Sequence, residues 1–154
     1  MIAALRPNAW DLPLFVHVLG AMTLVGTLIA ALTAQALASG AQAPVAMLRR
    51  FTFRTLLLGT VPAYLVMRVA AQWILSKEHD LNSKIDDQTW VGIGFMVTDI
   101  GVLLLVATCI VAWRAAKKAP EGGNGLARAT TILTGILLVV YLVAMWAMTA
   151  KPGA

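Results

Sequence analysis

The sequence predicts an all-α membrane protein built as an up-down bundle of four transmembrane helices. The chain is 60% hydrophobic and only 12% charged, whereas soluble domains are about 25% charged on average. Four apolar runs are each longer than the roughly 18 residues that a membrane-crossing helix needs, and they cover residues 12–38, 51–76, 90–116 and 126–149. Short connections make neighbouring helices antiparallel, which gives the up-down order. Because the four spans take up most of the length, we expect one transmembrane domain over residues 1–154.

Charge near the ends of the four spans predicts their orientation. The first-to-second and third-to-fourth connections are flanked by basic residues: Arg49, Arg50, Arg54, Arg114, Lys117, Lys118 and Arg128. The outer loop at residues 77–89 is instead rich in acidic residues: Glu78, Asp80, Asp86 and Asp87. Because cytoplasmic loops carry an excess of lysine and arginine, we expect this loop and both termini on the outer side. The net charge of +5 is thus a topology signal and does not indicate nucleic-acid binding.

The first span carries a stripe of small residues. We expect its helix to start near Asp11, with Pro13 in the first turn. Small side chains let another helix approach closely, and here they recur at every fourth position: Gly26, Ala30, Ala34 and Ala38. The stripe is expected to pack inside the bundle, or to contact a second copy or a larger membrane complex.

The remaining spans contain one predicted irregularity. Pro62 lies within the second span and cannot donate a backbone hydrogen bond, so a kink is expected near Leu58 or Gly59. Near its start the third span contains Gly92 and Gly94, which have no side chains and make the helix narrower there. It ends before a glycine-rich turn, which leads into the fourth span.

Two opposite charges inside the spans predict a polar site. Arg68 lies about eight residues before the end of the second span, and Asp99 about nine residues after the start of the third. At about 1.5 Å per residue, antiparallel helices place both at the same depth. An unpaired charge near the bilayer centre costs roughly 2.5–3.5 kcal/mol on insertion scales. The sequence therefore predicts an ion pair.

Other polar side chains fall near the same depth. His17 and Tyr141 come from the first and fourth spans, while Tyr64 and Gln72 share a helix face with Arg68 at a spacing of four. One interpretation is a pocket that binds haem b, copper or another metal, or a small anionic ligand. His17 would then be an axial or metal ligand and Arg68 the partner of an anionic group. The alternative is a structural ion pair that fixes helix register.

Methionine is a further candidate ligand at this depth. Met67, Met96 and Met145 lie within about two helical turns of it, and a thioether can bind haem iron or Cu(I) together with a histidine such as His17. Of these three, Met96 is assigned with His17 to the predicted metal site.

The start of the first span resembles a known group of proteins. His17-Val-Leu-Gly20 followed by Gly26 is similar to the opening of small bacterial four-helix membrane proteins, including CopD-like copper-resistance domains, HemJ-type protoporphyrinogen oxidases and their uncharacterised relatives. The resemblance implies that His17 binds haem or a metal, and that the protein has a redox or metal-handling role in the bacterial inner membrane. The chain departs from this pattern because it has no second histidine or lysine within a span.

Three functions remain open at this point. The first is a ligand-binding or redox-related membrane protein, with or without enzymatic activity. The second is a non-catalytic accessory or assembly subunit of a larger membrane complex, and the third is a small-solute transporter formed by several copies. The sequence contains no nucleophile elbow, phosphate loop or metalloprotease helix.

Overall fold

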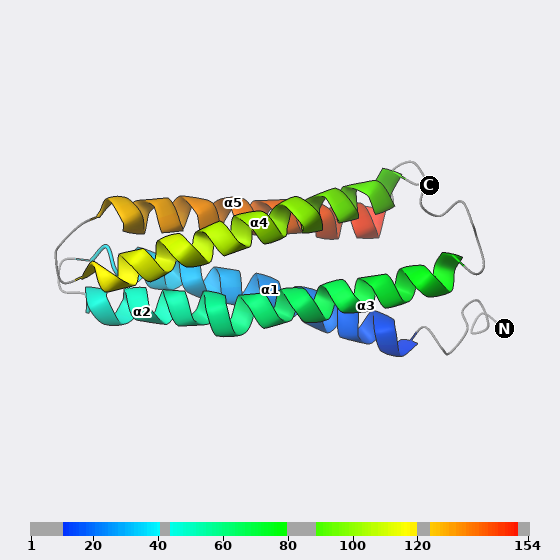
Figure 1. The fold of residues 1–154 in the computed structure, drawn as a ribbon, viewed down its shortest axis with the longest axis horizontal. Helices are drawn as coiled ribbons and strands as arrows, with labels where there is room; N and C mark the ends of the chain where they lie inside the picture. The colour runs from blue at the N-terminus through cyan, green and yellow to red at the C-terminus, as the bar shows by residue number, and fades with distance from the viewer. Residues whose placement is uncertain (1–10, 41–43, 80–88, 120–123, 151–154) are drawn as a thin grey trace.

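The chain folds into four long helical rods packed as a bundle, as predicted (Figure 1). The structure is a computed structural model and describes residues 11–40, 44–79, 89–119 and 124–150. Its helices are α1 (Asp11–Leu37), α2 (Val45–Thr55), η2 (Leu56–Thr60), α3 (Val61–His79), α4 (Thr89–Lys117) and α5 (Gly125–Ala150). The segments α2, η2 and α3 follow one another without a break and form the second rod. Each rod is long and apolar enough to cross a membrane.

Most of the apolar surface of these helices faces outward. In the most hydrophobic part of each span, only 22–33% of the residues are buried inside the bundle. Leu58, Val69 and Leu103 are among the large apolar side chains that remain exposed. A four-helix bundle with such a surface contacts the lipid bilayer, because acyl chains are the apolar surroundings that this surface requires.

The second rod begins earlier than the sequence predicted. Helix α2 starts at Val45, whereas the apolar run starts at residue 51. Arg49 therefore lies inside a helix, where it is 5% exposed. Its Nη2 donates a 3.0 Å hydrogen bond to Oδ1 of Asn124, directly before α5. The hydropathy pattern predicted that Arg49 lies in a connection, because hydropathy takes no account of a polar partner that is distant in the sequence.

The predicted irregularity in the second rod is a single π-helical turn, η2. The backbone N–H of Val61 donates to the carbonyl of Leu56, five residues earlier. Pro62 follows directly and has no N–H for the usual bond to the residue four positions back. Within this turn the Thr60 hydroxyl donates to the Thr27 hydroxyl of α1 at 2.9 Å. The wide turn therefore also fixes the second rod against the first.

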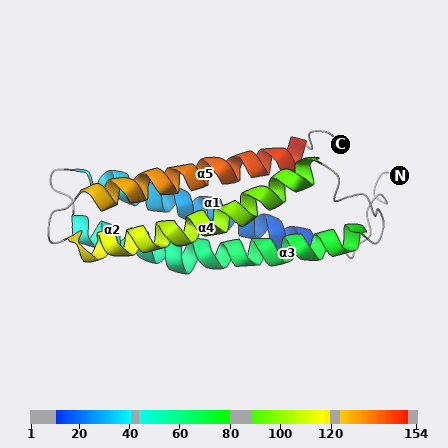
Figure 2. The same ribbon diagram turned by 45° about the horizontal axis from the view of Figure 1, so that its top comes forward.

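The bundle is closed at one end and splayed at the other. Helix α1 packs mainly on α3, and α4 mainly on α5. Both views show these two pairs close together near α2 and diverging toward the end where α1 begins (Figures 1 and 2). We call that end the Asp11 end. In the closed part the core is formed by large buried side chains: Leu24, Leu28, Leu56, Leu105 and Leu137.

The small-residue stripe of α1 does not form one continuous packing face. Ala34 is buried inside the bundle, and Ala30 and Ala38 are partly buried. Gly26 is exposed, with no atom within 4 Å of the position its Cβ would occupy. Internal packing therefore uses only part of this stripe. The predicted acidic outer loop and the terminal tails lie mostly outside the described residues.

Candidate functional site

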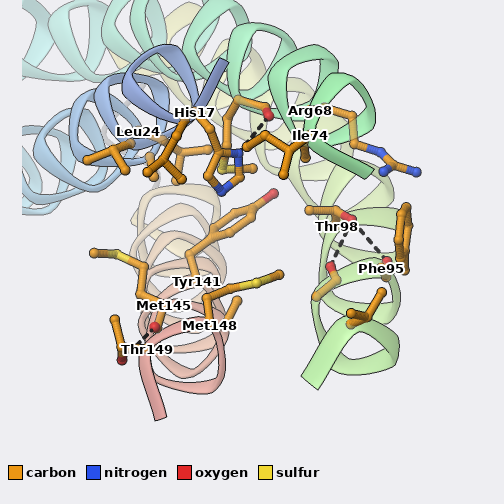
Figure 3. A pocket seen from close by; sticks show the side chains of 18 of the residues that line it. His17, Leu24, Arg68, Ile74, Phe95, Thr98, Tyr141, Met145, Met148 and Thr149 are labelled. Atoms are coloured by element: carbon orange, nitrogen blue, oxygen red, sulfur yellow. Dashed lines mark hydrogen bonds between the residues drawn. The ribbon is translucent and has the colours of Figure 1, made fainter. Parts of the chain in front are cut away.

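A cavity lies between the two helix pairs at the Asp11 end. Its volume is about 670 Å³, within the roughly 300–1,000 Å³ of typical ligand pockets. Most of its lining is apolar, and all four rods contribute. A few polar or charged side chains are part of the lining: His17, Arg68, Thr98, Tyr141 and Thr149 (Figure 3).

His17 is held in one orientation by α3. Its Nδ1 lies 3.0 Å from the backbone carbonyl oxygen of Met67. A carbonyl oxygen only accepts hydrogen bonds, so Nδ1 carries the proton and donates it. In the neutral ring Nε2 then has a free lone pair. Figure 3 shows this second nitrogen turned into the cavity, on the side of Tyr141.

A close contact between two backbones makes the His17 bond possible. Gly20 lies one turn after His17 on α1, and a Cβ at this position would be 2.8 Å from the backbone nitrogen of Met67. Only a residue without a side chain allows α1 and α3 to approach this closely. Gly20 thus positions the imidazole against the Met67 carbonyl.

Tyr141 is a buried phenol at the wall of the cavity. Its side chain is 3% exposed, and its hydroxyl packs against Gly101, where a Cβ would be only 2.7 Å away. Within the described ranges, this hydroxyl has no hydrogen-bond partner. A buried hydroxyl without a partner is costly, so Tyr141 offers an unused donor beside the cavity.

This geometry predicts opposite effects for two tyrosine-to-phenylalanine changes in the protein without a ligand. Tyr141→Phe removes an unpaired hydroxyl and is expected to leave the free energy of unfolding unchanged or to raise it by up to about 1 kcal/mol. Tyr64→Phe is the matched control, because the Tyr64 hydroxyl donates to the carbonyl of Thr98 at 3.2 Å. Its loss is expected to cost about 0.5–1.5 kcal/mol. Unfolding in detergent, followed by circular dichroism, measures both, and the reverse order would contradict the assignment.

Arg68 and Asp99 lie close together, at the edge of the cavity. Arg68 Nη2 is 3.1 Å from Asp99 Oδ1, and the guanidinium carbon lies 4.7 Å from the ring centre of Phe95. Arg68 is part of the lining, but Asp99 is not. Their side chains are 23% and 65% exposed, and Figure 3 shows Arg68 pointing away from His17 and Tyr141. The carboxylate therefore faces the outside of the bundle.

The other residues predicted for the site lie outside the lining. Tyr64 is buried and links α3 to α4 through its bond to Thr98. Gln72 is exposed one turn after Arg68. Met96 is 64% exposed on α4, so the structure does not bring it to His17. The cavity contains His17, Tyr141 and Arg68 from the predicted set, while the ion pair and the Tyr64 contact lie between α3 and α4.

Two residues that contribute to the site were not predicted from the sequence, Phe95 and Met148. Phe95 stacks under Arg68, and its position four residues before Asp99 places it on the same helix face. Met148 lines the cavity from α5, seven residues after Tyr141 and therefore on the same face of that helix. Two of the three candidate thioether ligands, Met67 and Met145, line the cavity as well.

Comparison with known proteins gives no relative for this chain. No protein family, curated protein or solved structure matches it. The fold bears out the general plan of a small four-helix membrane protein, and the resemblance of the His17 segment stays a prediction. Among the described residues, no group of three or more histidine, cysteine, aspartate or glutamate side chains could hold a metal ion.

Proposed function

We propose that the protein binds a haem in the cavity at the Asp11 end and acts in electron transfer within the bacterial inner membrane. The orientation of His17 carries this proposal. An axial histidine typically donates its other ring N–H to a carbonyl or carboxylate, which fixes the tautomer and makes the ligating nitrogen more basic. The bond from Nδ1 to the Met67 carbonyl has this form, and Nε2 turns into an apolar cavity (Figure 3).

The rest of the cavity suits this ligand class. Because a porphyrin supplies four iron ligands itself, the protein has to add only one or two axial groups and apolar walls. Met145 and Met148 line the cavity from α5, and the thioether of either would be available to hold the iron together with His17. Arg68 is also part of the lining, and its guanidinium, already paired with Asp99 at the edge of the cavity, would suit a ligand carboxylate that reaches this edge. When bound, haem would supply one-electron redox chemistry.

The proposal includes an orientation in the membrane. Exposed basic residues gather at the end of the bundle opposite the cavity: Arg50, Arg54, Arg114, Lys117, Lys118 and Arg128. Their excess at one end favours the cytoplasmic side for that end. The cavity then lies in the outer half of the bilayer, where the ligand would exchange electrons near the outer surface.

An absorption spectrum of the protein purified from bacterial membranes tests the proposal. We expect a Soret band in the purified protein, and a loss of bound haem of at least about tenfold in His17→Ala, because even changes around a ligating histidine cost 10–100-fold. His79→Ala, at the chain's other histidine, is the matched control and should keep the band. Added imidazole should restore part of the band in His17→Gly.

Three results would contradict haem binding at His17. One is a full Soret band in His17→Ala, and another is an equal loss in His79→Ala. The third is a protein without colour. Copper bound in a His17-dependent manner would then favour the metal-binding alternative, and stable copurification with larger subunits would favour the accessory-subunit alternative.

A further inference from the structure

Asp99 presents a carboxylate to the part of the bilayer that contains acyl chains. It lies ten residues after the first residue of α4, a helix of 29 residues. At about 1.5 Å per residue the helix is about 43 Å long and Asp99 lies about 15 Å from its start. Since the hydrocarbon core is about 30 Å thick, Asp99 is below the headgroups. A side chain that is 65% exposed there would face lipid.

The ion pair within the chain does not remove this problem. It joins one guanidinium nitrogen to Oδ1 of Asp99, whereas a carboxylate offers about four acceptor sites. Gln72, one turn after Arg68, is exposed as well. Acyl chains offer no hydrogen-bond partners, and polar side chains within the bilayer almost always turn toward protein or water. A polar cluster at this depth therefore indicates that protein covers it.

We propose that a second copy of this chain covers the face formed by Arg68, Gln72 and Asp99. The face carries both a guanidinium and a carboxylate, so it is complementary to itself under a two-fold rotation. Arg68 of each copy would then bond Asp99 of both copies, since a guanidinium has five N–H donors. The Gln72 amides, which both donate and accept, would lie near each other.

Two further features of the face suit a second helix. Gly92 lies seven residues before Asp99, on the same side of α4, and has no atom within 4 Å of the position its Cβ would occupy. An open glycine lets a partner helix approach closely. Arg68 lines the cavity, so the second copy would border the cavity edge between α3 and α4. None of this depends on what the cavity binds.

Disulfide cross-linking in native bacterial membranes tests the proposed dimer. Cys109→Ser removes the only cysteine, and single cysteines are then placed on the face by Met96→Cys or Leu103→Cys. Val139→Cys, on α5 and 60% exposed, is the matched control. After treatment with a thiol oxidant, we expect several-fold more dimer from Met96→Cys and Leu103→Cys than from Val139→Cys.

Charge variants show whether the cluster causes the association. In the Leu103→Cys background, Arg68→Leu combined with Asp99→Leu should reduce the dimer several-fold, because this face then carries no charge that needs a polar partner. Arg68→Asp combined with Asp99→Arg keeps both charges and should retain the dimer. Equal cross-linking at Val139, no cross-linking, or cross-links only to a larger foreign protein would overturn the proposal. A His17-dependent Soret band without a dimer would overturn the dimer alone.

Discussion

Gly20→Ala is expected to destabilise the protein by about 1–3 kcal/mol, the usual cost of forcing extra atoms into a packed site. The new Cβ would lie 2.8 Å from the backbone nitrogen of Met67 and 3.0 Å from its Cα. Both contacts involve the backbone of α3, which cannot rotate away as a flexible side chain can. Helix α1 must therefore move outward, and this movement lengthens the bond between His17 and the Met67 carbonyl.

Gly26→Ala is the matched control in the same helix. No atom lies within 4 Å of the position of its Cβ, and alanine is more favourable than glycine within a helix by about 1 kcal/mol. This variant should be as stable as the original protein or slightly more stable. Denaturant unfolding in detergent, followed by circular dichroism, measures both variants. Similar stabilities for the two alanine variants would mean that α1 and α3 are not in backbone contact at Gly20.

The helices could be predicted because length and composition alone determine whether a segment can cross a bilayer. Three of the four predicted spans begin and end within one residue of the helices that the structure shows. The predicted start of the second span was wrong, because α2 begins at Val45 and includes Arg49. The partner of this arginine, Asn124, is 75 residues away, and no local measure of hydropathy includes such a contact.

The depth of the site residues was predictable, but the direction of each side chain was not. Depth follows from the rise per residue, so the pairing of Arg68 with Asp99 is confirmed by the 3.1 Å contact. Direction depends on how each helix is rotated about its own axis. The spacing of Tyr64, Arg68 and Gln72 defines a shared face, but it does not determine which neighbour this face meets. The π turn η2 adds to the difficulty, because it changes the rotation of all residues that follow it.

The predicted site is divided into two parts because of the rotation of each helix about its own axis, which could not be predicted. His17 and Tyr141 turn inward because α1 and α5 place them between the two helix pairs, whereas Asp99 turns outward on α4. The predicted pocket therefore consists of two neighbouring parts, an apolar cavity that includes His17 and Tyr141 and a charged cluster at its edge. Arg68 belongs to both parts and so connects them.

Breaking the ion pair from one side is expected to have the second large effect. Asp99→Asn leaves the Arg68 guanidinium with the Phe95 ring but without its carboxylate. Arg68→Gln leaves the Asp99 carboxylate without its cation. Each single change should lower the free energy of unfolding by about 2–3 kcal/mol, since an uncompensated charge within the bilayer costs this much.

The double variant separates an ion pair from two independent charges. With both side chains neutral, no uncompensated charge remains, so the combined loss should be smaller than the sum of the two single losses by about 1–3 kcal/mol. Arg50→Gln, an exposed arginine at the other end of the bundle, is the control, and its effect should add to that of Asp99→Asn within about 0.5 kcal/mol. These values come from unfolding in detergent. The proteins are the original chain, the two single variants and the double variant, with Arg50→Gln alone and combined with Asp99→Asn as controls. Additive losses at Arg68 and Asp99 would mean that the two groups do not stabilise each other, because only a direct interaction makes the second change cheaper than the first.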